Sequence, residues 1–262
     1  MIESNKARLE AIQNSHVTEQ MLENHKKIDQ LEIDHEKVWV KRSESTHSNL
    51  FHRLVYRMTK LKILMPVENK TPSESLHFEA NKLRFLAQQG IPVPEVIGYD
   101  THFLYLSDSG TDLRDYLKQT VLTQGEKEII ITKALKVLCA IHNNGCYHAG
   151  AQIKNYTIQD DQVSAIDFED SFSDKYRLED IQFRDFFLFL FSLASFNNNI
   201  IYQEVIELYR SLTGNSDTRD RLKNMARKTT PLLKSIDFIS ARSYLGHDVM
   251  SVCALLSFIL SM

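Results

Sequence analysis

Five polar residues have the types and the order that phosphate chemistry with a divalent cation requires. Asn155 closes a polar loop that begins at His148, and Asp167 follows an alternating strand pattern after that loop. Amide and carboxylate oxygens are hard ligands that suit Mg²⁺. Upstream, Lys41 stands near the end of a predicted strand and Glu79 lies in a predicted helix. A set of this kind could hold the phosphates of a nucleotide and neutralise charge while a phosphoryl group moves.

The spacing inside the loop matches the catalytic loop of kinases. In the pattern H-R-D-x-x-x-x-N, the asparagine follows the aspartate by five positions. Counting back five positions from Asn155 reaches Gly150, and His148 then occupies the histidine position. The strand–turn–strand pattern between Asn155 and Asp167 fits the hairpin that separates the two metal ligands in kinases. We therefore predict that Asn155 and Asp167 hold metal, with Asp167 also catalytic.

Two features depart from the kinase pattern. Gly150 carries no carboxylate to accept a proton, and no glycine precedes Gly90, so a glycine-rich loop over the phosphates is absent from the sequence. A general base contributes roughly 10²–10⁴-fold, and phosphoryl transfer has a loose transition state that needs little activation of the nucleophile. His148 or Gln152 could orient the acceptor hydroxyl instead. Two hypotheses remain open, a slow kinase and a nucleotide-binding pseudokinase that regulates or scaffolds.

Composition restricts the class of protein. Hydrophobic residues make up 43% of the 262 and charged residues 25%, which is typical of globular chains. The net charge of −3 argues against a nucleic-acid partner. The three cysteines do not have the spacing of a disulfide framework, and the first residues lack an apolar signal region. The apolar stretches at 186–196 and 249–262 are shorter than the roughly 20 residues of a membrane span. We expect a cytoplasmic protein.

The elements that would position these residues divide the chain into two parts. Alternation at 28–42 predicts a hairpin, and 91–110 predicts two more strands after a helix at 73–89. Later residues are mostly helical, with one loop–strand–turn–strand stretch at 147–170. Helices are predicted at 3–24, 111–117, 125–145, 178–196, 201–214 and 243–262. The expected fold class is α+β and bilobal: an N-lobe at 1–107 with a helical extension, and a helical C-lobe at 108–262.

Three stretches resemble one known family. The runs EANKLRFLAQQGIPVPEVIGYD, FLYLSDSGTDLRDYL and FRDFFLFLFSL are similar to the αC helix, the hinge and a C-lobe helix of the bacterial lipopolysaccharide kinases. That family includes the heptose and deoxy-manno-octulosonic acid kinases and has the protein-kinase-like fold. The resemblance covers about residues 25–200. It implies ATP and Mg²⁺ as cofactors and a sugar hydroxyl, lipid-linked or free, as the acceptor.

The resemblance also implies roles for individual residues. Lys41 would contact the α- and β-phosphates, Glu79 would orient Lys41, and Asp185 would brace the catalytic loop. The adenine edge would be read by a second set of residues near the hinge. That set is Tyr105, Leu106 and Asp108.

Other interpretations of the same residues stay open. Lys41 and Glu79 could be solvated surface residues, and Asn155 and Asp167 could serve turns. A cluster of His142, Cys146 and His148 would be one ligand short of a zinc site. The chain could also be a helical adaptor that binds no nucleotide.

The predicted helix at 50–65 has a basic face and an apolar stripe. Most such helices pack on the protein body, but this composition also suits an interface with anionic lipids. Peripheral contact with the inner face of the membrane is therefore an alternative for this stretch.

Overall fold

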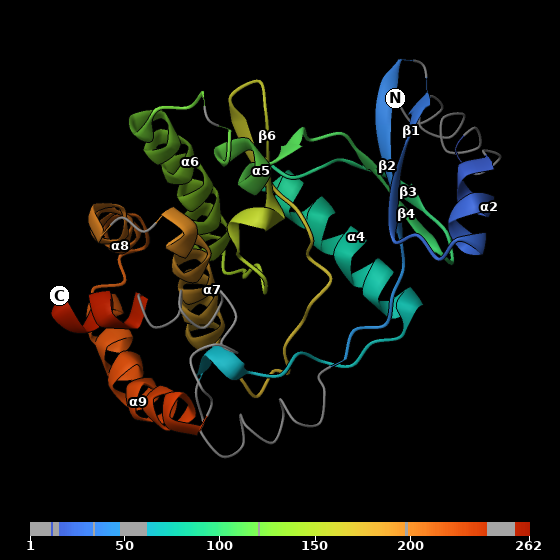
Figure 1. The fold of residues 1–262 in the computed structure, drawn as a ribbon. Helices are drawn as coiled ribbons and strands as arrows, with labels where there is room; N and C mark the ends of the chain where they lie inside the picture. Colours follow the sequence, from blue (N-terminus) through green and yellow to red (C-terminus); the bar gives the residue numbers. More distant parts are fainter. Residues whose placement is uncertain are drawn as a thin grey trace.

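The computed structural model describes residues 12, 16–33, 35–47, 62–119, 121–196, 199–239 and 255–262, and Figure 1 shows their arrangement. Most of the helix predicted at 50–65 and much of the one predicted at 243–262 lie outside these residues.

The strands are β1 (Ile28–Ile33), β2 (Glu36–Arg42), β3 (Val96–Tyr99), β4 (Phe103–Ser107), β5 (Thr111–Asp112), β6 (Tyr156–Gln159) and β7 (Gln162–Ala165). The α-helices are α2 (His16–Glu23), α4 (Pro72–Gln88), α5 (Leu113–Leu117), α6 (Gln124–Asn143), α7 (Leu178–Ser192), α8 (Asn199–Thr213) and α9 (Thr218–Ile239). Short 3₁₀ turns are η1 (Lys62–Leu64), η2 (Ile153–Asn155) and η3 (Leu193–Phe196).

A four-stranded antiparallel sheet has the order β1-β2-β4-β3. Side chains alternate between its faces because successive residues of a strand point in opposite directions. Val38 and Tyr105 therefore belong to a small core with α2. Leu104 and Leu106 pack on the opposite side with α4. This alternation places odd-numbered Trp39 and Lys41 of β2 on the α4 side, where the cavity described below lies.

Helix α4 lies between the sheet and the helical part of the molecule (Figure 1). Thr71 caps its N-terminus in a capping box with Glu74, and Pro72 occupies its first turn. The helix is followed by Gly90, whose φ of +71° is one that glycine adopts without steric cost. Its buried face is apolar except for a few residues that include Glu79.

The rest of the described chain is mainly helical around a second, three-stranded sheet of order β5-β6-β7. Helices α6, α7 and α8 share one large core with α4 and the sheets. The α+β prediction is confirmed: a small antiparallel sheet precedes a largely helical remainder, as in a kinase-like bilobal fold. We propose residue 107, where β4 ends, as the boundary between two lobes of one domain. Helix α9 was not among the predicted elements.

Within the described ranges, none of the helices has the length and apolar character needed to cross a bilayer.

Candidate functional site

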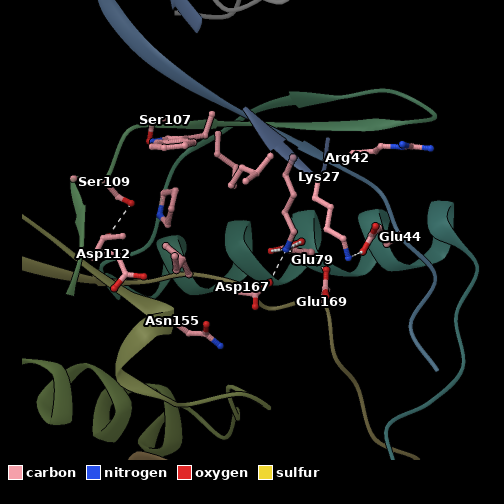
Figure 2. Close-up of a pocket in the computed structure, with 18 residues that line it drawn as sticks. Lys27, Arg42, Glu44, Glu79, Ser107, Ser109, Asp112, Asn155, Asp167 and Glu169 are labelled. Carbon is pink, nitrogen blue, oxygen red and sulfur yellow. Dashed lines mark hydrogen bonds and ion pairs between the residues drawn. The ribbon is translucent and has the colours of Figure 1, made fainter. Parts of the chain in front are cut away.

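A cavity of about 510 Å³ lies between the four-stranded sheet and the segment that carries β6 and the chain after β7 (Figure 2). Trp39, Leu106 and Pro94 form part of its wall at one end. The other end is highly charged. The charged side chains that line the cavity are Lys27, Lys41, Arg42, Glu44, Glu79, Asp112, Asp167 and Glu169.

Lys41 bridges three carboxylates at the charged end. Its Nζ lies 3.0 Å from Oε1 and 2.9 Å from Oε2 of Glu79, and 2.7 Å from Oδ1 of Asp167. A third contact of 3.1 Å reaches Oε2 of Glu169. In the sequence, Glu79 is 38 residues and Asp167 is 126 residues from Lys41. The cluster therefore forms only because α4 and the second sheet pack beneath β2.

Glu79 also fixes the backbone beside Asp167. Its Oε1 accepts a hydrogen bond of 3.2 Å from the backbone N–H of Phe168. Asp167 itself has a φ of +69°, a left-handed conformation that is uncommon for residues other than glycine. Its side chain is 41% exposed, compared with 3% for Glu79 and 33% for Glu169, so Asp167 is the most exposed carboxylate of the cluster.

The cluster changes the ionisation of its members. Burial alone would lower the pKa of Lys41, but the charges of Glu79, Asp167 and Glu169 outweigh it and hold that pKa well above its ordinary value. Burial raises the pKa of Glu79 despite the attraction of Lys41. Burial also disfavours the charged form of Asp167, yet the charge and hydrogen bond of Lys41 keep its pKa below the usual range. Lys41 and Asp167 are therefore both charged at neutral pH.

The loop before Asn155 folds back on itself. The side-chain Nδ2 of Asn155 donates a 2.7 Å hydrogen bond to the carbonyl oxygen of Gly150, and the backbone N–H of Gln152 donates to the same oxygen at 2.6 Å. Asn155 lines the cavity together with Asp167. The side-chain nitrogen Nδ2 of Asn155 is bonded to Gly150, so the side-chain oxygen Oδ1 is the atom of Asn155 that is suited to a ligand.

Asp185 of α7 holds the start of this loop. Its carboxylate accepts hydrogen bonds from the backbone N–H of His148 at 2.6 Å and from that of Ala149 at 3.0 Å. Ala149 has a φ of +82°, and Arg184 donates to its carbonyl oxygen. The fully buried Asp185 thus stabilises a backbone turn that would otherwise be strained.

Neither His148 nor Gln152 belongs to the described lining of the cavity. His148 is completely buried, its ring stacks on Phe168 with centroids 4.4 Å apart, and it is absent from the described lining of the cavity. Burial lowers the pKa of His148, so the ring is a neutral core group. Gln152 is also outside the described lining. The burial of His148 speaks against a contact of its ring with an acceptor, whereas the role of Gln152 in orienting an acceptor hydroxyl stays a prediction.

The structure separates the side chains predicted to read the adenine edge. Leu106 lines the cavity, but Tyr105 and Asp108 do not. Tyr105 points to the opposite face of the sheet, where its hydroxyl donates to Asp100. Asp108 contacts the cavity only through Trp39, because its Oδ1 accepts a 2.8 Å hydrogen bond from Nε1 of that lining residue.

Sequence reasoning missed Trp39 and the contact of Glu169. Trp39 is the single tryptophan of the chain and lies two positions before Lys41 in an alternating strand. Because side chains of a strand alternate between two faces, Trp39 and Lys41 share one face, and this alternation alone would have predicted Trp39 beside Lys41. The pairing of Glu169 with Lys41 depends on how the chain turns after Asp167.

The donor set fits a magnesium-bound nucleotide. The carboxylate of Asp167 and the free amide oxygen of Asn155 are hard oxygen ligands on the same cavity wall. The zinc interpretation has no such support. No group of three or more His, Cys, Asp or Glu that could hold a metal occurs in the part of the chain that the structure describes. His142 and His148 pack instead on Tyr209 and Phe168.

Comparison with known proteins matches part of the chain to a family. Residues 44–150 match the phosphotransferase enzyme family, a stretch that includes Glu79 and α4 but ends before Asn155. The chain is also 30% identical to an uncharacterized protein of Haemophilus influenzae over 135 residues, which are 52% of this chain and 55% of that relative. The chain thus spans about half the length of the curated relative that it matches. The family match supports a kinase-like phosphotransferase, whereas the similarity to an uncharacterized relative carries no activity with it.

Proposed function

We propose that this protein binds ATP with Mg²⁺ and transfers the terminal phosphoryl group to a sugar hydroxyl, as the lipopolysaccharide kinases do. The observation that carries the proposal is the pairing of Lys41 with both Glu79 and Asp167 at the wall of a 510 Å³ cavity. Phosphoryl transfer is catalysed mainly by positioning and charge neutralisation, and these three groups supply both.

Each residue has a separate task in the proposal. The ammonium of Lys41 neutralises the α- and β-phosphates, and Glu79 keeps that ammonium in place. Asp167 and the amide oxygen of Asn155 hold the magnesium ion, whose charge offsets the negative charge that develops on the phosphoryl oxygens. Asp185 preserves the backbone turn that presents Asn155.

The apolar end of the cavity suits a purine base. Trp39, Leu106 and Pro94 line it, and the hydrogen bond to Asp108 fixes the indole ring. Stacking of a base on an aromatic side chain contributes about 1–3 kcal/mol and does not depend on the base's hydrogen bonds. Because Trp39 is the single tryptophan, its fluorescence would report directly on the occupied cavity.

The acceptor remains a proposal that rests on the resemblance to lipopolysaccharide kinases. The basic stretch at 50–65 would bring a lipid-linked sugar to the site through anionic head groups at the inner face of the membrane. Residues 50–61 of that stretch lie outside the described ranges.

A nucleotide-binding pseudokinase is the second candidate function. It is favoured by Gly150, because within the described lining of the cavity no carboxylate comes from the loop between His148 and Asn155. Such a protein would bind Mg·ATP through the same residues but would not turn it over. It would act through a nucleotide-bound conformation that a partner protein recognises.

Both functions are tested by titrating Trp39 fluorescence with Mg·ATP and measuring ATP consumption over a panel of sugar and lipid-linked sugar acceptors. We expect a saturable change in emission that Asp167→Asn weakens at least about tenfold, since a charge-assisted metal contact is lost. Asp174→Asn, at an exposed position in the same segment, is the matched control. Saturable binding without consumption of ATP by any acceptor would favour the pseudokinase. Unchanged affinity and turnover in Asp167→Asn would rule out this site.

A further inference from the structure

The sequence has no glycine before Gly90 that could form a glycine-rich loop over the nucleotide phosphates, and no described residue next to the β1–β2 turn lines the cavity. The turn of the β1–β2 hairpin lies next to Ile33 and Glu36. Lys41 pairs instead with Ile28 at the opposite end of that hairpin. The phosphate end of the cavity is therefore bordered by the start of β1.

Charge at this end limits what can bind. Of the described residues that line the cavity, four carboxylates and three cations lie at this end, a formal difference of 3 − 4 = −1, since Asp112 lies with Ser109 at the other end (Figure 2). A polyphosphate would add further negative charge, so each cation matters for its affinity. The three cations are Lys27, Lys41 and Arg42.

All three cations have partners, but two of them are less free to turn to a new ligand than Lys27, which has a single exposed ion pair. Lys41 is shared among Glu79, Asp167 and Glu169. Arg42 contacts Nδ1 of His25 through Nη1 at 3.2 Å, and its side chain runs away from Glu79 and Asp167 (Figure 2).

Lys27 is the cation that remains available. It precedes β1, and its carbonyl oxygen accepts a hydrogen bond from the backbone N–H of Arg42 at 2.8 Å, which fixes its position beside β2. Its Nζ pairs with Oε2 of Glu44 at 2.6 Å, at the end of the cavity away from Ser109 and Asp112 (Figure 2). The Lys27 and Glu44 side chains are 73% and 45% exposed, and ion pairs this exposed are weak enough for a polyphosphate to displace the carboxylate.

We propose that Lys27 is a second phosphate-binding residue, which replaces the missing glycine-rich loop by a side-chain ammonium that Glu44 holds until a nucleotide polyphosphate arrives. The inference rests on the proposed function, because it assumes that the cavity takes a nucleotide. Lys27 then approaches the phosphates from the residue before β1 and Lys41 from β2, while Asp167 and Asn155 approach them from the other side of the cavity.

The test measures dissociation constants of adenosine, AMP, Mg·ADP and Mg·ATP by Trp39 fluorescence. In Lys27→Met we expect adenosine to bind as in the wild type, AMP to weaken slightly, and Mg·ADP and Mg·ATP to weaken about tenfold, the value of one charge-assisted hydrogen bond. Lys26→Met is the control, since Lys26 is also exposed but pairs with Asp29 and is outside the described lining. Glu44→Gln should tighten Mg·ATP binding about two- to threefold by releasing Lys27 from a surface ion pair.

The outcomes separate this inference from the function on which it rests. Unchanged Mg·ATP affinity in Lys27→Met, with affinity lost in Lys41→Met, would overturn the role of Lys27 alone. An equal loss for adenosine and Mg·ATP in Lys27→Met would also overturn it, because the effect would not lie at the phosphates. If the wild type bound none of the four ligands, the nucleotide site itself would be wrong.

Discussion

The amide nitrogen of Asn155 donates a 2.7 Å hydrogen bond to the backbone carbonyl oxygen of Gly150, five residues earlier. The two residues stand where kinases have a metal ligand and a proton acceptor. In this protein the Asn155 side chain closes the loop through the backbone of Gly150, so the loop closes although Gly150 has no carboxylate. Two departures therefore bear on activity, namely Gly150 and the absence of any glycine before Gly90.

Gly150→Asp should restore the missing proton acceptor. A Cβ at this position would lie 3.1 Å from Nδ2 of Asn155, so Asn155 must shift slightly, and the variant should fold. With a general base present, we expect ATP consumption to rise by about 10²-fold or more. The assay uses the acceptor panel above, with Gly150→Asn as the variant of equal size that lacks a base. A folded variant that binds Mg·ATP but shows no gain would contradict a kinase role for this loop.

Lys41→Met should destabilise the fold because it leaves the buried carboxylate of Glu79 without its cation. Removal of one partner of a buried ion pair costs roughly 3–5 kcal/mol. The pKa of Glu79, already raised in the wild type, should rise further, so its protonated form is favoured when folded. The loss of stability should therefore grow as pH increases from about 5 to 8. Urea unfolding of the variant across this range is the measurement.

The matching control for Lys41→Met is the double variant Lys41→Met with Glu79→Leu, which removes the uncompensated charge. It should recover most of the lost stability. Equal instability in the single and double variants would show that the charge on Glu79 is not the cause.

Asp185→Ala should lower stability by about 3 kcal/mol, because two buried backbone N–H groups, those of His148 and Ala149, lose their acceptor. Burial opposes the charge on Asp185, but His142, His148 and Arg184 outweigh it and hold its pKa below the ordinary value. The stability that Asp185 contributes should thus be present above pH 4 and disappear as pH falls through that lowered pKa. Urea unfolding at pH 3 and pH 7, with hydrogen exchange at the two amides, measures both effects. Asp174→Ala should change neither quantity.

Lys82→Met should stabilise the protein at pH 7. The Nζ of Lys82 has no hydrogen-bond partner among the described residues and lies 3.8 Å from the ring centroid of Tyr147. Burial lowers its pKa from 10.5 to about 8. Because the folded-state pKa lies below the unfolded one, wild-type stability should rise between pH 8 and 10.5, by up to about 3 kcal/mol.

In Lys82→Met that rise should be absent, and denaturation from pH 7 to 10 would show it. Lys118→Met, at an exposed site, serves as the control and should retain the rise. If the wild type and Lys82→Met changed in parallel over this range, Lys82 would keep its charge in the folded state.

Local sequence patterns were sufficient for most of the elements and for their order. Alternation in β1 and β2, the capping box of Thr71 and Glu74, and Gly90 after α4 act over a few residues, so they can be recognised without knowing the fold. The spacing of Asn155 and Asp167 likewise predicted which residues share a loop and a hairpin. Their metal and nucleotide roles stay predictions.

Which side chains meet in the cavity was decided only by the tertiary structure. Tyr105 and Leu106 are neighbours in one strand, and the packing of α4 on one face of the sheet determines that Leu106 lines the cavity while Tyr105 does not. His148 fits a motif, but its stacking on Phe168 removes it from the site. The contacts of Lys41 with Asp167 and Glu169 span more than 120 residues, and contacts at that separation depend on how sheets and helices pack rather than on any local pattern.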